Sequence, residues 1–391
     1  MSDVRIYYAT CFYDIGRSDW ETFPRTFDDY LAEFEPFVDL FNKEDRQKHQ
    51  LFVYLDTAHL GRFEKYLQKN EPAAERNIHV VPITEKWLEK TTQWKDLEKE
   101  REVMGSEEYK KTVGDRVKFP ESRFPEYTMI NHIKIDLLKH VYDYFVRGDV
   151  SKSYLAWVDF GFFKKDHLAR GPENYVPERL LDETNFETDK VHYTVINPLS
   201  EEDLDAAYTL KNAPEKVAGY FFFLRSDRIL GYHKLYRETL ATFRECGYAD
   251  DDQHLVIQCY SRLPHLFKFH RLPWHTALVK FQKRESIAGT LLKKVFGDDK
   301  IKTVGDDQEG SDDMLTLLGA GLSEEECRGL KAKFPNSKIY NISRDNFALP
   351  GIVGLSCDCH ASESFAPKKE ALQRLLKKDL KYISPDAVYT H

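Results

Sequence analysis

Apolar runs rich in β-branched and aromatic residues alternate with segments of helical periodicity in the first 200 residues. This alternation is typical of a sheet whose strands are joined by crossover helices, so we expect an α/β protein. Strands are predicted at 4–10, 50–56, 77–83, 153–159, 191–197 and 217–224. Helices are predicted at 22–42, 59–70, 125–147 and 228–245, and the charged stretch 86–120 is expected to be a helical excursion or a mobile insertion.

The chain is long enough for two domains, since 391 residues exceed the usual domain size of about 100 to 200 residues. Its character changes after Trp274, where a basic stretch at 277–296 precedes an acidic, glycine-containing segment at 305–313. A second α/β pattern follows, with strands near 300–304 and 338–342 and helices near 323–334 and 367–378. We therefore predict a first domain at 1–285 and a smaller C-terminal α/β domain of unknown role at 298–391.

The net charge of -8 argues against a protein that binds nucleic acid without sequence preference, because that affinity comes mainly from Lys and Arg. Small molecules or neutral glycans fit better. No run of about 18 apolar residues is present, so no transmembrane segment is expected. Met1 leads directly into an alternating strand pattern without a secretory leader, which predicts a cytoplasmic protein. The basic stretch 277–296 is more often a solvated helix face than a membrane anchor, and any membrane contact through it would be peripheral.

The six cysteines are few for this length, and we expect them to stay reduced, without a structural disulfide. Cys357, Cys359 and His360 suggest metal ligands at first sight. A second cysteine pair at the spacing of a zinc site is missing, so we predict no zinc site there.

The sharpest motif is the apolar run 154–158, which ends abruptly in Asp159, with Gly161 two residues later. Ligands of α/β sheets bind outside the carboxyl ends of the strands, where an aspartate can hold a divalent cation or ribose hydroxyls. The alternative is that Asp159 only caps the next turn. Asp-Phe-Gly is also a protein-kinase triplet, but the glycine-rich loop, the Val-Ala-Ile-Lys strand and the His-Arg-Asp loop of kinases are absent from the sequence.

The loop after the first predicted strand contains Asp14, Gly16, Arg17 and Trp20. A glycine for close approach, an arginine for phosphate and an aromatic ring for a base suit a nucleotide diphosphate. Arg17 could equally be a surface ion-pair partner. Lys134 lies on the polar side of the helix predicted at 125–147. It could bind phosphate as a point charge, or it could be a structural lysine whose aliphatic stem is buried.

Two later segments complete the candidate site. Gly219 and Tyr220 begin an apolar run, and three carboxylates at Asp250–Asp252 precede a helical pattern. These carboxylates could supply a general base and a helix N-cap, or be a solvated charge run. Among the histidines of the loop-like stretch 263–275, His270 could ligate a metal or a pyrophosphate, although such histidines are more often structural.

The order of these motifs resembles the HtrL/YibB family, over about residues 1–275. The resemblance rests on the run 10–17 with Trp20, on Lys134, on the run 157–161 and on Asp251, Asp252 and Gln253. That family occurs in bacterial surface-polysaccharide gene neighbourhoods. More distantly, the layout is similar to GT-A glycosyltransferases, whose nucleotide-diphospho-sugar transferase fold is a mixed sheet with flanking helices.

The resemblance implies a role for each matching residue. Asp251 or Asp252 would be the catalytic base. The nucleotide sugar would be bound by Thr10, Asp14, Arg17, Trp20, Lys134, Asp159, Gly161, Gly219, Tyr220 and Gln253. A divalent cation, Mn²⁺ or Mg²⁺, would bind Asp159, with His270 as a further candidate ligand. The second carboxylate of the GT-A Asp-x-Asp motif is Gly161 here, and only Asp166 is close enough in sequence to replace it.

We therefore predict a glycosyltransferase that moves a sugar from a nucleotide-diphosphate sugar to a glycan or lipid-linked acceptor in polysaccharide or glycan biosynthesis. The alternative is a non-catalytic carbohydrate- or nucleotide-binding partner in a polysaccharide assembly, a hypothesis that Gly161 favours. A third hypothesis is a nucleotide-sugar hydrolase or nucleotidyltransferase, which would act without a glycan acceptor.

Overall fold

The chain divides into two compact units, Met1–Lys283 (unit 1) and Arg284–His391 (unit 2). The computed structural model describes residues 4–43, 47–70, 77–170, 175–177, 180–181 and 187–282, and four strands of unit 2 at 316–320, 338–343, 352–356 and 388–390. The functions given to the two predicted domains stay predictions.

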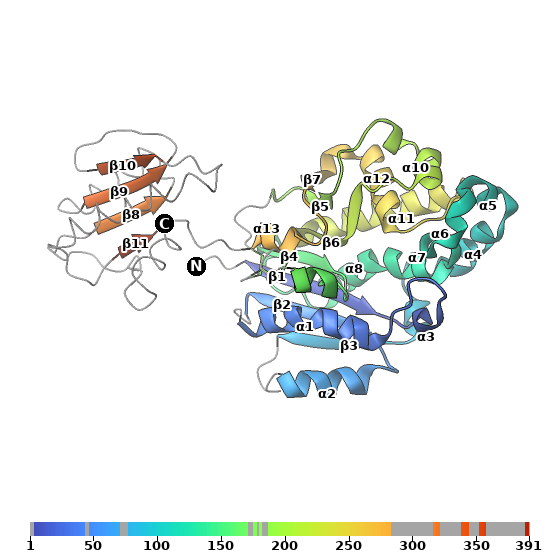
Figure 1. Ribbon diagram of the computed structural model, residues 1–391, viewed down its shortest axis with the longest axis horizontal. Coiled ribbons are helices and arrows are strands. Elements are labelled where there is room, and N and C mark those ends of the chain that lie inside the picture. Colours follow the sequence, from blue (N-terminus) through green and yellow to red (C-terminus); the bar gives the residue numbers. More distant parts are fainter. Residues whose placement is uncertain are drawn as a thin grey trace. The chain divides into compact units, whose positions relative to one another are not determined.

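Unit 1 is built on one seven-stranded sheet with the order β3-β2-β1-β4-β6-β5-β7 (Figure 1). Its strands are β1 Arg5–Phe12, β2 His49–Asp56, β3 Ile78–Ile83, β4 Ser153–Val158, β5 Val191–Val195, β6 Val217–Arg225 and β7 Phe267–Arg271. Strands β3, β2, β1 and β4 are mutually parallel, whereas β6 runs antiparallel to both β4 and β5. The mixed α/β sheet with flanking helices that the sequence predicts is confirmed, and all six predicted strands are present within two residues of their expected ends.

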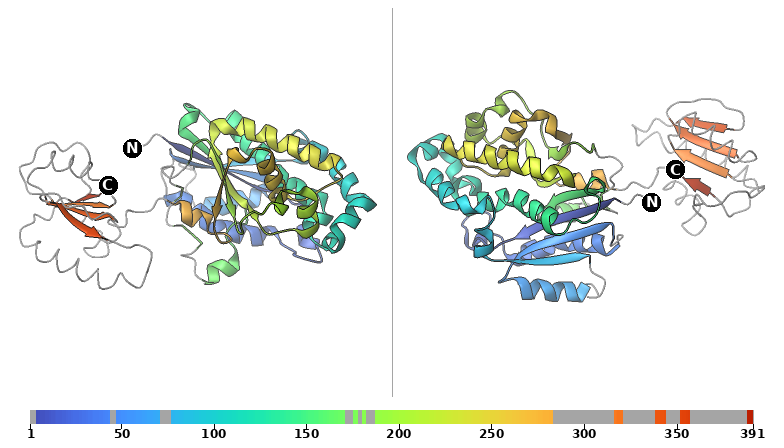
Figure 2. Two further views of the ribbon diagram at one scale, coloured as in Figure 1. Left: turned by 90° about the horizontal axis from the view of Figure 1, so that it is seen from above. Right: turned by 180° about the vertical axis from the view of Figure 1, so that it is seen from behind.

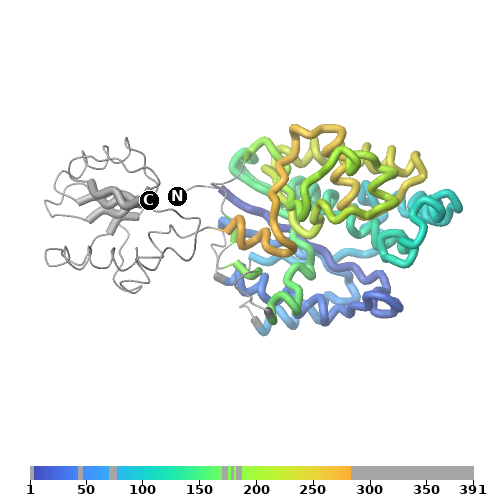
Figure 3. Tube along the Cα trace, turned by 45° about the horizontal axis from the view of Figure 1, so that its top comes forward, coloured from blue at the N-terminus to red at the C-terminus, as the bar shows by residue number. Residues whose placement is uncertain are grey.

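Helices cover both faces of this sheet (Figure 2). Successive side chains of β1 point to opposite faces of the sheet, as in any strand. Tyr7 and Ala9 belong to one apolar core, and Ile6 and Tyr8 belong to the other. The first core is covered by α7 Pro125–His132, α8 Lys134–Tyr144, α11 Ile229–Glu245 and α12 Asp252–Arg262. The second is covered by α1 Phe27–Lys43, α2 Leu60–Asn70 and the short α13 Ala277–Phe281, where the trace of unit 1 in Figure 3 ends.

Two predicted segments differ from the structure. The stripe expected to be one helix over 125–147 forms α7 and α8, which meet at Ile133, where a ψ of -10° departs from helical geometry. The stretch 263–275, expected to be a loop, contains the edge strand β7, which pairs with β5 alone. Phe267 and Phe269 alternate with Lys268 and His270, a strand pattern, but the run is short and lies between Pro264 and Pro273, which are typical of a loop.

The charged stretch 86–120 is a helical excursion, as predicted. It contains α3 Glu85–Leu88, α4 Leu97–Gly105, α5 Glu107–Val113 and α6 Pro120–Arg123. Buried Met104, Tyr109 and Val113 pack with Leu210 and Ala249 in a third apolar cluster. These helices are therefore anchored to the loop that precedes α12. The remaining short helices of unit 1 are α9 Lys165–Arg170 and α10 Ala206–Asn212.

The strands of unit 2 form a parallel sheet with the order β10-β9-β8-β11. They are β8 Thr316–Ala320, β9 Lys338–Ser343, β10 Ile352–Ser356 and β11 Val388–Thr390. The strand predicted at 338–342 is β9. The strand predicted near 300–304, the helices predicted near 323–334 and 367–378 and the residues Cys357, Cys359 and His360 lie outside the described residues.

Among the helices that the structure describes, none combines the length and the apolar character needed to cross a membrane.

Candidate functional site

The main cavity of unit 1 lies where the sheet changes its winding direction. From β1 the chain moves outward to β2 and β3, and then returns to place β4 on the other side of β1. In open α/β sheets such a switch point leaves a crevice at the carboxyl ends of the strands, where ligands bind. A cavity of about 580 Å³ is found there, and its lining includes Phe12 and Tyr13 from the end of β1 and Asp159 to Gly161 after β4.

The cavity wall carries more basic than acidic side chains. Five basic residues line it, against three carboxylates. The basic residues are Arg17, Arg25, Arg62, Lys134 and Lys164, and the carboxylates are Asp14, Asp28 and Asp159. A concave surface with an excess of one charge favours a ligand of the opposite charge. The cavity is therefore suited to a small anion such as a nucleotide.

Lys134 is the central charged group of the site. It begins α8, and its Nζ lies 3.1 Å from Asp159 Oδ1 and 3.0 Å from Asp252 Oδ2, and donates to the carbonyl oxygen of Gly219 at 3.0 Å. Burial lowers the pKa of Lys134, but the two carboxylates outweigh burial and raise it above its ordinary value. The ammonium group therefore stays charged and holds together segments far apart in the sequence.

Asp252 lies on the inner side of Lys134. Burial raises the pKa of Asp252 to about 7, against the opposing effect of the Lys134 charge. Asp252 does not itself line the cavity, whereas its partner Lys134 does. Gly219 packs directly against the carboxylate: a Cβ atom at position 219 would lie 2.4 Å from Asp252 Oδ2.

Asp159 follows β4 at the cavity wall. Its Oδ1 accepts a hydrogen bond of 2.7 Å from Trp157 Nε1 in addition to the ion pair with Lys134. Two residues on, Gly161 is closely packed: a Cβ atom there would lie 2.8 Å from Glu33 Oε2 and 2.9 Å from Tyr30 Cδ1. The second carboxylate of an Asp-x-Asp motif therefore has no room at position 161. Asp166, the nearest alternative in the sequence, is exposed on α9 and does not line the cavity.

The loop after β1 is arranged around Arg17. Its Nη1 donates to the Tyr30 hydroxyl at 2.7 Å, and its guanidinium lies within 6 Å of the rings of Trp20, Tyr30 and Tyr127. Trp20 stacks on Phe124 with ring centroids 4.2 Å apart and is not part of the cavity lining. The structure therefore places Arg17 at the cavity, but uses Trp20 to attach the loop to the start of α7.

The other residues predicted to bind the nucleotide sugar differ in whether they line the cavity. The Asp14 carboxylate lines the cavity and accepts a 2.8 Å hydrogen bond from the Gly16 backbone. Thr10 is fully buried in β1, and Tyr220 stacks on His275 with ring centroids 4.7 Å apart. Neither Thr10 nor Tyr220 lines the cavity.

The two residues predicted as metal ligands cannot share one ion. His270 lies on β7, and β5 and β6 separate it from β4, so three strand spacings or about 14 Å lie between His270 and Asp159. His270 instead contacts His192, with ring nitrogens 2.9 Å apart. Asp159 and His270 therefore do not belong to one metal site, and a cation at Asp159 stays a prediction.

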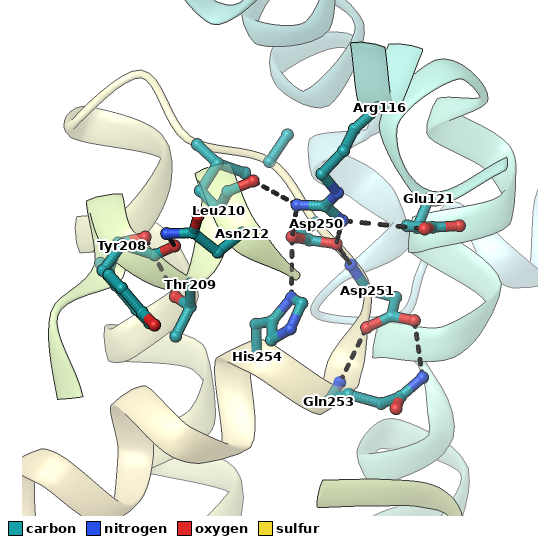
Figure 4. A network of polar contacts seen from close by, with 12 residues as sticks. Arg116, Glu121, Tyr208, Thr209, Leu210, Asn212, Asp250, Asp251, Gln253 and His254 are labelled. Carbon is teal, nitrogen blue, oxygen red and sulfur yellow. Dashed lines mark hydrogen bonds and ion pairs between the residues drawn. The ribbon is translucent and has the colours of Figure 1, made fainter. Parts of the chain in front are cut away.

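The carboxylates at Asp250–Asp252 are not a solvated charge run. Their exposed fractions are 1%, 7% and 4%, and each has its own task. Asp251 caps α12 by accepting the backbone N–H of Gln253 at 3.0 Å, and its other oxygen accepts the Gln253 side-chain amide. Asp250 pairs with Arg116 and with His254 (Figure 4), and Asp252 pairs with Lys134.

Asp250, Asp251 and His254 could hold a divalent cation, since each offers a ligand atom within 4.8 Å of the others. Arg116 and His254 already contact Asp250 (Figure 4): Arg116 Nη1 lies 3.2 Å and His254 Nδ1 lies 2.9 Å from Asp250 Oδ2. Burial lowers the pKa of His254, but Asp250 outweighs it, and the pKa is raised. None of the three residues lines the main cavity, so an ion bound there would not contact a ligand in that cavity.

Sequence reasoning missed several members of the site. Arg25, Glu33 and Lys164 form one cluster beside Gly161, and Arg116 supports Asp250 from the helical excursion. Of these residues, only Lys164 could have been predicted from the sequence, because it is the first of two lysines that follow the Asp159 motif. Glu33 and Arg116 lie on helices and Arg25 lies in the loop before α1, and the pairing of these segments with the site depends on the tertiary fold.

Comparison with known proteins identifies the family to which the chain belongs. The family model described as "Bacterial protein of unknown function (HtrL_YibB)" matches residues 3–283. Protein HtrL of Escherichia coli (strain K12) is 22% identical over 278 residues, covering 67% of this chain and 86% of that protein. Among solved structures, mouse xyloside xylosyltransferase 1 in its apo form aligns with 69% of this chain and 85% of its own, at 12% identity and a TM-score of 0.33. The family match over 3–283 confirms the resemblance seen in the sequence, and the chain belongs to the HtrL/YibB family.

Proposed function

We propose that unit 1 is a glycosyltransferase that moves a sugar from a nucleotide-diphosphate sugar to a hydroxyl of a glycan or lipid-linked acceptor. One observation carries the proposal: the cavity at the β1/β4 switch point is lined by an excess of basic side chains. That position is where α/β sheets bind nucleotides, and the charge suits a diphosphate. Aromatic Phe12, Tyr13 and Phe27 in the same lining offer surfaces for a base and a sugar ring.

The chemistry requires a base and a stabilised leaving group. The acceptor oxygen forms a bond to the anomeric carbon, and the bond from that carbon to the diphosphate breaks, with its electron pair leaving on the nucleoside diphosphate. In the proposed reaction the acceptor proton goes to Asp252, which lies behind Lys134 and outside the cavity lining, so the acceptor hydroxyl must reach it past the Lys134 ammonium group. Its pKa of about 7 fits a general base at neutral pH. Basic side chains of the cavity wall stabilise the charge that develops on the diphosphate.

The pKa of Asp252 gives the proposal a pH dependence. Only the deprotonated carboxylate accepts the acceptor proton, so kcat/KM should rise with pH, reach half its maximum near pH 7 and level off about one unit above that value. Initial rates between pH 5.5 and pH 9 measure the profile. Asp252→Asn should remove the rise together with the activity. A flat profile in the unchanged protein would exclude Asp252 as the base.

The donor is identified by a thermal-shift screen of the full chain against UDP-, GDP-, CMP- and dTDP-sugars, each with and without manganese. A ligand that binds only the native state raises the apparent melting temperature. We expect one nucleotide family to raise it by several degrees, at least about 2 °C for a ligand at 100 times its Kd. If none of these compounds raises the melting temperature in either buffer, the nucleotide-sugar proposal is wrong.

The second candidate function is a non-catalytic carbohydrate- or nucleotide-binding partner. The observation that favours it is the loss of the second carboxylate at Gly161, where Glu33 and Tyr30 fill the space. A transferase releases nucleoside diphosphate when both donor and acceptor are present and loses this release in Asp252→Asn. A binding partner shifts in melting temperature with the same ligand but releases no product, and a hydrolase releases product without an acceptor.

A further inference from the structure

From the same site we infer that the donor diphosphate is held by Arg25 and Lys164, two cations of the cavity wall, without a divalent metal at Asp159. The inference rests on the proposed function in one respect: it takes the ligand to be a nucleoside diphosphate. It names the residues that would neutralise this ligand, and neither of them carries a motif in the sequence.

The first argument is a charge imbalance beside Gly161. Arg25 Nη2 and Lys164 Nζ both pair with the same atom, Glu33 Oε2, the lysine at 3.4 Å. Two positive charges therefore share one carboxylate, and the cluster of Arg25, Glu33 and Lys164 retains one net positive charge. Both cations line the cavity, whereas Glu33 lies behind them and is buried. A partly buried excess charge that faces a cavity attracts an anion more strongly than a hydrated surface charge does.

The second argument is that this arrangement destabilises the charged form of Lys164. Burial, followed by the nearby Arg25 guanidinium, lowers the pKa of the Lys164 ammonium group. The ammonium group also donates to the carbonyl oxygen of Gly161 at 2.6 Å, which fixes its position at the end of the Asp159 motif. A bound diphosphate would offset the repulsion between the two cations and would form charge-assisted hydrogen bonds with both.

The third argument concerns the carboxylate that a metal would need. Asp159 already pairs with Lys134 at 3.1 Å, a cation that it shares with Asp252, and the same oxygen accepts the Trp157 indole N–H. A divalent ion on Asp159 would lie close to the Lys134 ammonium group, which is held in place by Asp252 and Gly219. The two cations would repel each other in a partly buried site.

The run that follows Asp159 also offers no second carboxylate to a metal. Mg²⁺ and Mn²⁺ are bound through several oxygen ligands, and a second carboxylate at position 161 would overlap Glu33 and Tyr30. Lys164 lines the cavity, and its positive charge would stabilise the leaving diphosphate as a metal ion would. The residues present therefore fit a diphosphate held by side chains better than one held by a metal.

Isothermal titration of the full chain tests this inference with UDP and GDP as probes and with uridine and guanosine as phosphate-free references. Titrations are run in EDTA and again in manganese chloride. We expect one diphosphate to bind in EDTA with an affinity within about threefold of that in manganese. Lys164→Gln should weaken its binding by at least about tenfold and leave binding of the nucleoside unchanged, because only the diphosphate meets the cation.

Matched variants separate this effect from a loss of folding. Lys165→Gln removes the neighbouring lysine, which is exposed, pairs with Asp29 and does not line the cavity, and should leave the affinity unchanged. Lys164→Arg should restore most of the affinity lost in Lys164→Gln. In Lys164→Gln the Glu33 carboxylate remains paired with Arg25, so the fold has no buried, unpaired carboxylate.

Asp159→Asn has opposite effects on diphosphate affinity, depending on whether side chains or a metal on Asp159 hold the diphosphate. If side chains hold the diphosphate, removing this carboxylate tightens diphosphate binding by about threefold, because a like charge leaves the cavity wall. If a metal on Asp159 holds it, binding requires manganese, fails in EDTA and is lost in Asp159→Asn, and the inference is overturned while the proposed function stands. If neither diphosphate binds in either buffer, both the inference and the proposed function fail.

Discussion

Gly219→Ala is expected to lower the proposed transfer activity by at least about 100-fold and the free energy of unfolding by about 3 kcal/mol. The new methyl group would lie 2.4 Å from Asp252 Oδ2, a distance that Cβ contacts do not reach. The Asp252 carboxylate must therefore shift, although it is buried and paired with the buried Lys134 at 3.0 Å. The variant weakens a buried ion pair and displaces the proposed base by the same shift.

Gly231→Ala is the matched control for Gly219→Ala. Gly231 lies within α11, and a Cβ atom there meets nothing within 4 Å. Alanine at this helical position should raise the free energy of unfolding by about 0.5 to 1 kcal/mol, because it lowers the entropy of the unfolded chain. Urea titrations followed by tryptophan fluorescence measure both variants. If Gly219→Ala has the stability and activity of the unchanged protein, the tight contact with Asp252 is not required.

Arg116→Met is expected to lower the free energy of unfolding of unit 1 by about 3 to 5 kcal/mol, the usual loss when a buried ion pair is broken from one side. Arg116 contacts Asp250 at 3.2 Å, and Asp250 is 1% exposed. Without the guanidinium, His254 alone faces this carboxylate as a cation. All five tryptophans lie within residues 20–274, so their fluorescence in urea reports on unit 1 alone.

Arg101→Met provides the comparison for Arg116→Met. Arg101 also pairs with two carboxylates, Glu98 and Glu126, but its side chain is 44% exposed. Exposed pairs contribute about 1 kcal/mol or less, so this variant should be nearly as stable as the unchanged protein. If Arg116→Met also loses less than about 1 kcal/mol, the ion pair with Asp250 does not anchor the helical excursion.

The sheet could be predicted because its strands carry a strong local signal. Strands β1, β2 and β4 are almost completely buried, so they appear in the sequence as continuous apolar runs. The edge strand β7 could not be found in this way. Among the described strands it pairs with β5, and its short apolar–polar alternation lies between Pro264 and Pro273, so the segment resembles a loop in the sequence.

The candidate site was predictable only where a strand ends. Asp159 stood out because a buried run stops at it, and Arg17 because it follows the first strand. The contacts that define the chemistry join distant segments: Lys134 and Asp252 are 118 positions apart, and Arg116 and Asp250 are 134 positions apart. No local pattern indicates such pairs, because each partner lies on its own helix or loop and only the packed sheet brings the two together.

The close packing of Gly161 against Glu33 also limits how relatives of this protein can diverge. Positions 33 and 161 compete for one small volume, so a side chain at 161 fits only if the residue at 33 is shorter or turned away. A lineage that gains an aspartate at 161 must therefore shorten residue 33 or turn it away, and Arg25 and Lys164 then lose the carboxylate they share. In an alignment of relatives, positions 25, 33, 161 and 164 should vary as one block and divide the family into two groups of sequences.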